Sequence, residues 1–134
     1  MGILRLMPKK KIFIADDQEE VLSMLKDFLS SKGYEVMGSK ESRELVKSIK
    51  KFQPDLILLD LLMPDLDGFE ICRILNSDPE AQAIPIIIMS GLSDLVDIQR
   101  AYKLGVVGYL TKPFDMNLVV AEIEKAIANK ERPH

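Results

Sequence analysis

The stretch DLILLD at residues 55–60 decides the fold class, because four consecutive apolar residues stand between two aspartates. A continuous apolar run of strand length indicates a strand that is covered on both faces, as in a parallel sheet. Similar runs lie at residues 11–15, 84–89 and 106–111, and a further short strand is expected at residues 34–38. The sequence therefore predicts five strands.

Amphipathic segments alternate with these strands. Apolar residues recur at helical spacing around residues 21–29, 45–52, 71–75, 95–102 and 115–129. Gly33 and Gly105 are expected to end the first and the fourth of these helices, because glycine adopts the left-handed conformation that follows many helices. Pro54 and Pro79 are expected to close the second and the third.

This alternation predicts an α/β fold with right-handed crossovers and helices on both faces of a parallel sheet. With five strands and five helices, the expected arrangement is flavodoxin-like and doubly wound, with strand order 2-1-3-4-5. The chain has 134 residues, which suits one domain. We expect an N-terminal extension at 1–10, the domain at 11–129 and a C-terminal tail at 130–134.

Composition excludes several classes of function. The net charge is −3 and the lysines are scattered, which argues against direct binding of nucleic acid. The longest apolar stretches fall well below the roughly 18 residues of a membrane-spanning helix, so we expect a cytoplasmic protein. Cys72 is the only cysteine, which excludes an internal disulfide and a Cys-rich metal site. His134 is the only histidine and the last residue, which excludes catalysis by an internal histidine.

Polar side chains stand where the apolar runs end. They are Asp16, Asp17, Asp60, Ser90 and Lys112. The carboxyl ends of parallel strands lie along one edge of the sheet, and open α/β proteins place their sites there. The three aspartates would meet at the switch point between the first and third strands. We therefore expect three acids, a hydroxyl and an amine in one pocket.

Simpler interpretations exist for each of these residues alone. Asp17 fits a helix N-cap, with Glu20 three residues later completing an acidic capping box. Asp60 can be a turn former, Ser90 a loop hydroxyl and Lys112 a solvated lysine. A shared site explains all of these residues at once, whereas the separate interpretations require each polar residue to stand at its strand end by coincidence.

The chemistry of such a pocket follows from its charge. Two carboxylates about 4 Å apart repel each other by roughly 4 kcal/mol at an effective dielectric near 20, so the cluster needs counter-charges. A divalent cation and Lys112 would supply them. Ligands that are all oxygen atoms suit magnesium, which binds through one or two carboxylates together with a phosphate. An aspartate can then act as a nucleophile and carry an acyl phosphate.

Taken together, these motifs closely resemble the receiver domain of two-component response regulators, over residues 11–129. The residues that carry the resemblance are Asp16-Asp17, Asp60 with Met63-Pro64 and Asp67-Gly68-Phe69-Glu70, Ser90-Gly91 and Tyr109-Leu110-Thr111-Lys112-Pro113-Phe114. The resemblance implies that Asp60 is the phosphoacceptor and that Lys112 pairs with the phosphate. It also implies a magnesium ion held by Asp17, by Asp60, by the backbone carbonyl of Leu62 and, through water, by Asp16.

The resemblance further implies a switch. Ser90 would bond a phosphoryl oxygen, and Tyr109 would move inward to fill the vacated space, although Tyr109 alone also fits a core aromatic. The expected output surface is the face formed by the fourth helix, fifth strand and fifth helix, within residues 95–129. The Lys112-Pro113 bond is expected to be cis. The implied partners are a sensor histidine kinase or phosphotransfer protein and a downstream protein target, with the chain a monomer or a weak dimer.

Two departures from the family pattern stand out. Gly91 replaces a more usual alanine, and Leu62 replaces a polar residue that often positions the attacking water, so we expect slow self-dephosphorylation.

The chain is expected to be a phosphoacceptor that catalyses its own phosphotransfer, and not a classical enzyme. It resembles chemotaxis regulators, whether it stands alone or is part of a longer protein. The alternative is a magnesium-dependent phosphohydrolase acting on a small substrate, which would need a further acid or base and a substrate-sized pocket. An inert receiver-like module would have lost part of the cluster.

Overall fold

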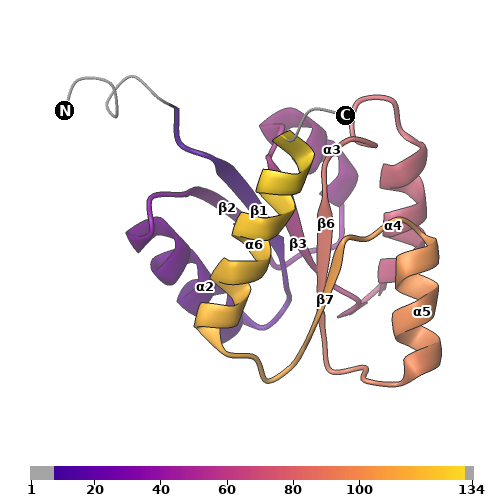
Figure 1. The fold of residues 1–134 in the computed structure, drawn as a ribbon. Helices are drawn as coiled ribbons and strands as arrows, with labels where there is room; N and C mark the ends of the chain where they lie inside the picture. The colour runs from indigo at the N-terminus through magenta and orange to yellow at the C-terminus, as the bar shows by residue number, and fades with distance from the viewer. Residues whose placement is uncertain (1–7, 132–134) are drawn as a thin grey trace.

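A parallel sheet forms the centre of the protein, in a computed structural model that describes residues 8–131 (Figure 1). The strands are β1 (Lys11–Ala15), β2 (Glu35–Ser39), β3 (Leu56–Asp60), β6 (Ile86–Ser90) and β7 (Gly108–Thr111). Their order is β2-β1-β3-β6-β7, with every neighbouring pair parallel. The predicted doubly wound order 2-1-3-4-5 is confirmed. The expected extension and tail fall partly on residues 1–7 and 132–134, which lie outside the described residues.

Helices cover both faces of this sheet (Figure 1). They are α2 (Glu19–Ser31), α3 (Leu45–Phe52), α4 (Gly68–Ser77), α5 (Leu95–Lys103) and α6 (Met116–Glu131). Apolar residues of α2 and α6 share one core cluster, while those of α3, α4 and α5 share the other. None of the helices in the described part of the chain is long and apolar enough to cross a bilayer.

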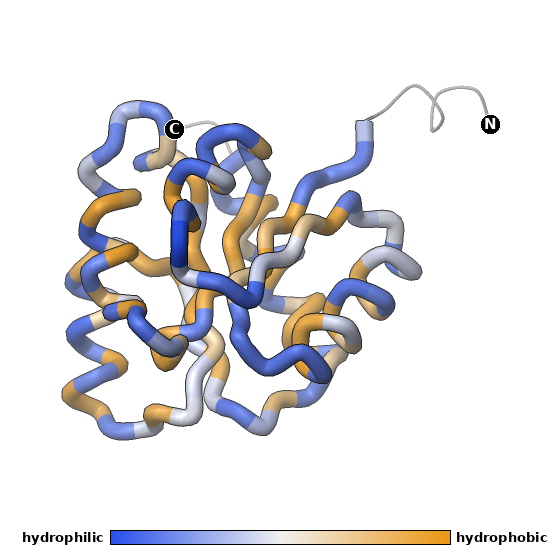
Figure 2. Tube along the Cα trace, turned by 180° about the vertical axis from the view of Figure 1, so that it is seen from behind, coloured by the Kyte–Doolittle hydropathy of each residue, from blue (hydrophilic) through white to orange (hydrophobic). Residues whose placement is uncertain are grey.

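The strand β3 shows why the decisive stretch is continuously apolar. Leu56 and Leu58 pack in the cluster beneath α2 and α6, whereas Ile57 and Leu59 pack in the opposite cluster. All of these side chains are fully buried. Figure 2 shows the same arrangement as a hydrophobic centre, with helices that alternate between hydrophobic and hydrophilic residues. The stretch therefore supplies a strand that contributes to both cores.

Element ends differ from the prediction by a few residues. The strands expected to start at Ile84 and Val106 start two residues later. The backbone N–H of Ile84 bonds to the carbonyl of Ala81 in the preceding turn, and that of Val106 bonds to the carbonyl of Ala101 in α5. The final helix continues to Glu131, past the expected end at Asn129, and Glu131 there pairs with Lys10. Both glycines expected to end helices have φ +97°, so that prediction is confirmed.

Candidate functional site

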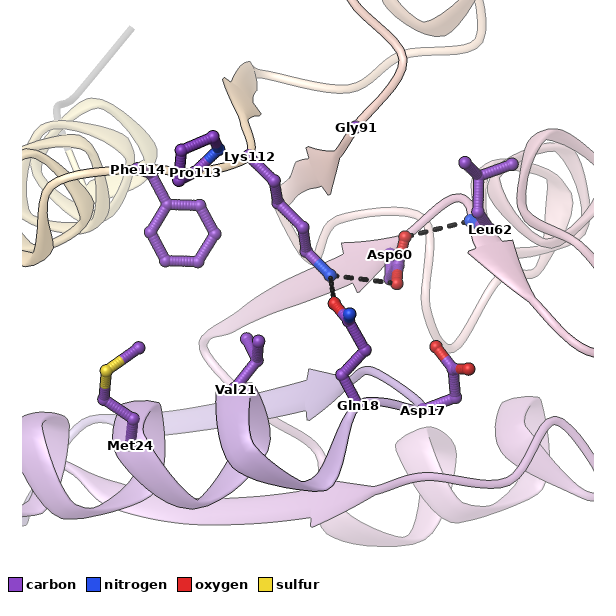
Figure 3. Close-up of a pocket in the computed structure, with 10 residues that line it drawn as sticks. All are labelled: Asp17, Gln18, Val21, Met24, Asp60, Leu62, Gly91, Lys112, Pro113 and Phe114. Atoms are coloured by element: carbon purple, nitrogen blue, oxygen red, sulfur yellow. Dashed lines mark hydrogen bonds and ion pairs between the residues drawn. The ribbon is translucent and has the colours of Figure 1, made fainter.

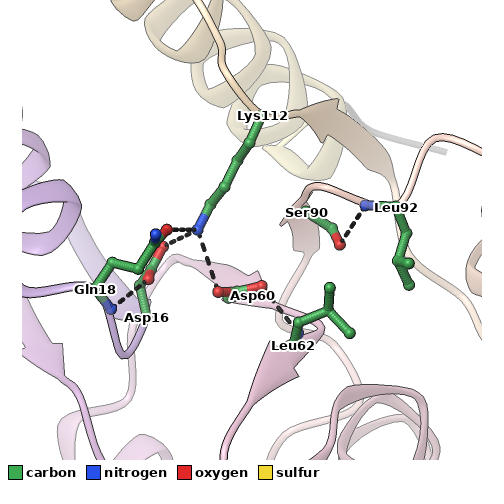
Figure 4. A network of polar contacts seen from close by, with 7 residues as sticks. All are labelled: Asp16, Gln18, Asp60, Leu62, Ser90, Leu92 and Lys112. Atoms are coloured by element: carbon green, nitrogen blue, oxygen red, sulfur yellow. Dashed lines mark hydrogen bonds and ion pairs between the residues drawn. The ribbon is translucent and has the colours of Figure 1, made fainter.

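The carboxyl ends of the central strands gather the polar residues into one site (Figure 4). Asp16 directly follows β1, Asp60 and Ser90 are the last residues of β3 and β6, and Lys112 directly follows β7. One carboxylate oxygen from each of Asp16, Asp17 and Asp60 lies within 4.8 Å of the others. The strand order thus brings together residues that are far apart in sequence.

The two adjacent aspartates, Asp16 and Asp17, differ in their burial and in their contacts. Asp16 is fully buried, and its Oδ1 accepts a hydrogen bond of 2.9 Å from the backbone N–H of Gln18. The helix α2 has Gln18 as its N-cap and no side-chain capping bond. The simpler interpretation of Asp17 as the N-cap is therefore wrong: the helix starts later, and the carboxylate of Asp17 faces the pocket (Figure 3).

Lys112 is the positive centre of the site, and its side chain is only 17% exposed. The ammonium donates hydrogen bonds to Asp16 Oδ2 at 2.7 Å, to Gln18 Oε1 at 2.8 Å and to Asp60 Oδ2 at 3.2 Å. Burial lowers the pKa of Lys112, but the bonds and charges of the two aspartates outweigh burial and raise it overall. The interpretation as a solvated lysine is wrong. The Lys112-Pro113 bond that follows is cis, as predicted.

Asp60 is nearly buried and is 3% exposed. Its Oδ1 accepts a bond of 2.9 Å from the backbone N–H of Leu62, so it does form a turn, while its Oδ2 faces Lys112. Burial raises the pKa of Asp60, and the nearby charge of Asp16 raises it further, whereas the Leu62 N–H and Lys112 lower it. The pocket therefore favours any additional positive charge beside this carboxylate.

Ser90 and Tyr109 are linked through a residue that the sequence did not point to. The buried Ser90 Oγ accepts a bond of 3.1 Å from the backbone N–H of Leu92. The half-buried Tyr109 donates its hydroxyl to the carbonyl of Leu92 at 2.7 Å. Burial raises the pKa of Tyr109, the nearby Ser90 hydroxyl lowers it to a smaller extent, and nearby acids raise it slightly. The backbone of a single residue in the loop after β6 thus contacts both side chains.

The segment between Asp60 and α4 includes regular secondary structure. It contains a short antiparallel pair, β4 (Leu62–Met63) with β5 (Leu66–Asp67). Asp67 then caps α4 by accepting from the backbone N–H groups of the next turn. Gly68 packs against Leu61, where an added Cβ would lie 2.6 Å from the Leu61 Cα. Close packing of this segment fixes the backbone next to Asp60.

A cavity of about 580 Å³ opens beside the acidic cluster (Figure 3). Its polar side is formed by Asp17, Gln18, Asp60 and Lys112, and its apolar side includes Val21, Met24 and Phe114. The sequence alone did not indicate this apolar side or the contact of Gln18. The spacing of Val21 and Met24 by three residues on one helix face was the available signal, but it reads equally well as core packing.

The donor set of the site suits a hard divalent cation. Each of the three clustered groups offers a carboxylate oxygen, and none offers the nitrogen or sulfur that softer metals prefer. Asp17 is the one carboxylate of the three that, among the described residues, accepts no hydrogen bond from Lys112. The position of the Leu62 carbonyl relative to such a cation stays a prediction.

Comparison with known sequences identifies the same family that the sequence motifs resemble. The profile of the family described as response regulator receiver domain matches residues 12–124. A probable transcriptional regulator, ycf27, of Porphyridium aerugineum is 33% identical over 96% of this chain and 55% of its own length. The alkaline phosphatase synthesis transcriptional regulatory protein PhoP of Bacillus subtilis is 32% identical over 91% of this chain and 50% of its own length. The chain spans about half the length of these curated relatives.

Solved structures share the fold. A signal receiver domain of a signal transduction histidine kinase from Syntrophus aciditrophicus aligns with TM-score 0.82 and 30% identity, over 93% of this chain and 95% of that one. The chemotaxis response regulator CheY4 of Vibrio cholerae aligns with TM-score 0.82 over 89% of this chain and 99% of that one. The latter is 24% identical, so it supports the fold alone.

Proposed function

Because this chain belongs to the response regulator receiver domain family, we propose that Asp60 accepts a phosphoryl group from a phosphohistidine of a sensor kinase or phosphotransfer protein. A receiver domain is a phosphoacceptor signalling module and not a classical enzyme. The observation that carries the proposal is the position of Asp60: a buried carboxylate with an ammonium on one oxygen, beside two further acids. The cavity is large enough for a small substrate, but among the described residues its lining adds no titratable group beyond Asp17, Asp60 and Lys112. It therefore lacks the further acid or base that the alternative, a phosphohydrolase, would need.

The transfer needs no general acid or base from this chain. A carboxylate oxygen of Asp60 attacks phosphorus, and the bond from phosphorus to the imidazole nitrogen of the donor breaks. The imidazole, whose other ring nitrogen carries a proton, leaves as a neutral group with the electron pair, and the acyl phosphate remains on Asp60. Lys112 neutralises charge on the phosphoryl oxygens, and the Ser90 hydroxyl donates a hydrogen bond to one of them.

We propose magnesium as the cofactor. Asp17 and Asp60 would bind it directly, Asp16 through water, and the Leu62 carbonyl would complete the protein ligands. When bound, magnesium neutralises the clustered carboxylates and orients phosphoryl oxygens. The fit rests on an oxygen donor set whose members lie within 4.8 Å of one another.

Asp17→Asn should weaken magnesium binding by at least about tenfold, because the number of ligand charges sets the affinity of such sites. Asp17 is suited to this test, since the bonds of Lys112 go to other residues. Titration calorimetry with magnesium checks the prediction. Asp27→Asn, which neutralises an exposed acid on α2, is the control and should bind as wild type does. Equal weakening by both variants would contradict a specific ligand role for Asp17.

The conformational change caused by phosphorylation would be transmitted through the loop after β6. When Ser90 turns toward a phosphoryl oxygen, its bond to the Leu92 N–H is lost, and the Leu92 carbonyl bonded to Tyr109 moves with the loop. We propose that the surface of α5, β7 and α6 then contacts a protein target. Large exposed apolar side chains on α5 and α6, Leu95 and Leu118 among them, support this choice.

The phosphoryl group should be long-lived, because the exposed Leu62 side chain cannot position an attacking water molecule. Leu62→Asn should speed hydrolysis by roughly tenfold, less than a full general base would give. The decay of phosphorylated protein, followed by intact mass, measures both rates. A wild-type half-life of seconds at room temperature would contradict the prediction.

The direct test of the function is incubation of the protein with magnesium and acetyl phosphate, followed by intact mass and peptide mapping. We expect one added phosphoryl group, on Asp60. A protein that gains none, or gains it on another residue, would overturn the proposal.

A further inference from the structure

Gln18 occupies an unusual position for its residue type. It is the N-cap of α2, with φ −79° and ψ 105°, yet its side chain makes no capping bond. Serine, threonine, aspartate and asparagine are preferred there, because their short side chains reach the first free N–H groups of the helix. The longer side chain of Gln18 instead crosses the site, and its Oε1 accepts a bond of 2.8 Å from Lys112 (Figures 3 and 4).

This contact completes the bonding of the ammonium group. A lysine ammonium has three N–H donors, and those of Lys112 go to Asp16, Asp60 and Gln18. Two of the acceptors are buried carboxylates and the third is a neutral amide. A lysine side chain is a flexible four-carbon stem, so its direction depends on such acceptors. The geometry fixes the ammonium beside Asp60.

We propose that Gln18 is a positioning residue that keeps the Lys112 ammonium in place for phosphoryl acceptance. The inference rests on the proposed function of Asp60. Once Asp60 carries a phosphoryl group, the carboxylate has lost its charge, and the ammonium bonds a phosphoryl oxygen in its place. The bond to Gln18 does not depend on the charge of Asp60, so it persists through the transfer.

The absence of a charge on Gln18 also favours phosphoryl acceptance. The site already contains three clustered carboxylates, and another negative charge would repel the phosphoryl oxygens of the donor. Asp16 also bonds the lysine, but its charge is shared with any cation that enters the site. An amide oxygen orients the ammonium without adding charge.

The test uses Gln18→Met, which has a similar length but lacks the oxygen acceptor. At saturating magnesium, phosphoryl acceptance from acetyl phosphate should slow by about fivefold, the effect of losing one hydrogen bond. The affinity for magnesium should stay within about twofold of wild type, because the carboxylate ligands are intact. Gln82→Met makes the same change at an exposed residue before β6, at the other end of the sheet, and should behave as wild type.

A spectroscopic signal separates positioning from a merely structural role at the start of α2. Nitrogen-15 NMR should detect a slowly exchanging ammonium for Lys112 in the wild type. That signal should persist in Gln18→Glu, which retains an oxygen acceptor, and should be lost in Gln18→Met. A retained signal in Gln18→Met would overturn the proposal even if the rate falls.

The outcomes also separate this inference from the proposed function. If the wild type gains no phosphoryl group, the proposed function fails and the positioning role fails with it. If the wild type is phosphorylated and Gln18→Met reacts at the same rate, the positioning role alone is wrong.

Discussion

Asp60→Asn should abolish phosphoryl acceptance, lowering its rate by at least about a hundredfold, because an amide oxygen is a poor nucleophile and the residue is the proposed acceptor. The substitution keeps the shape of the side chain, and an amide oxygen can still accept the bond from the Leu62 N–H. Lys112 keeps its bonds to Asp16 and Gln18. We therefore expect a folded protein that does not react.

The measurement is intact mass after incubation with magnesium and acetyl phosphate, beside the wild type. Asp65→Asn is the matched control: Asp65 is exposed in the neighbouring turn with φ 58°, a conformation that asparagine tolerates. It should gain a phosphoryl group at the wild-type rate. Equal labelling of the wild type and Asp60→Asn would show that the acceptor lies elsewhere.

Gly68→Ala should destabilise the protein by about 2 kcal/mol, through overpacking against the backbone. The added Cβ would lie 2.6 Å from the Leu61 Cα and 3.0 Å from the Leu61 carbonyl oxygen, and no rotamer change relieves a clash with backbone. Alanine favours a helix over glycine by at most about 1 kcal/mol, less than the clash costs. Leu61 follows Asp60 directly, so phosphoryl acceptance should fall as well.

Gly91→Ala is the matched control for this prediction. It makes the same chemical change at the rim of the cavity, where an added Cβ would meet no atom within 4 Å. Its effect on the free energy of unfolding should stay within about 0.5 kcal/mol. Urea unfolding of the two variants and the wild type compares them directly. A Gly68→Ala protein as stable as Gly91→Ala would show that the packing against Leu61 is not tight.

Much of the site could be predicted from the sequence, because Asp16, Asp60, Ser90 and Lys112 each stand at the end of an apolar strand. Once the strand order is known, a position at a strand end is also a position in space. Leu92 could not be predicted, since it contributes backbone groups, and backbone groups leave no mark on residue identity.

The sequence by itself determined the five-stranded α/β fold and the polar residues at the strand ends, because these follow from apolar periodicity and from which residue ends each run. The strand order that gathers the acids was expected as the usual doubly wound arrangement of five strands. The tertiary structure decided between interpretations that fit the local sequence equally well. Only the packed chain shows that Asp17 does not cap α2. Only there does Gln18 reach a lysine 94 residues away. Local patterns fix backbone conformation, whereas the partner of a polar side chain depends on distances set by the assembled sheet.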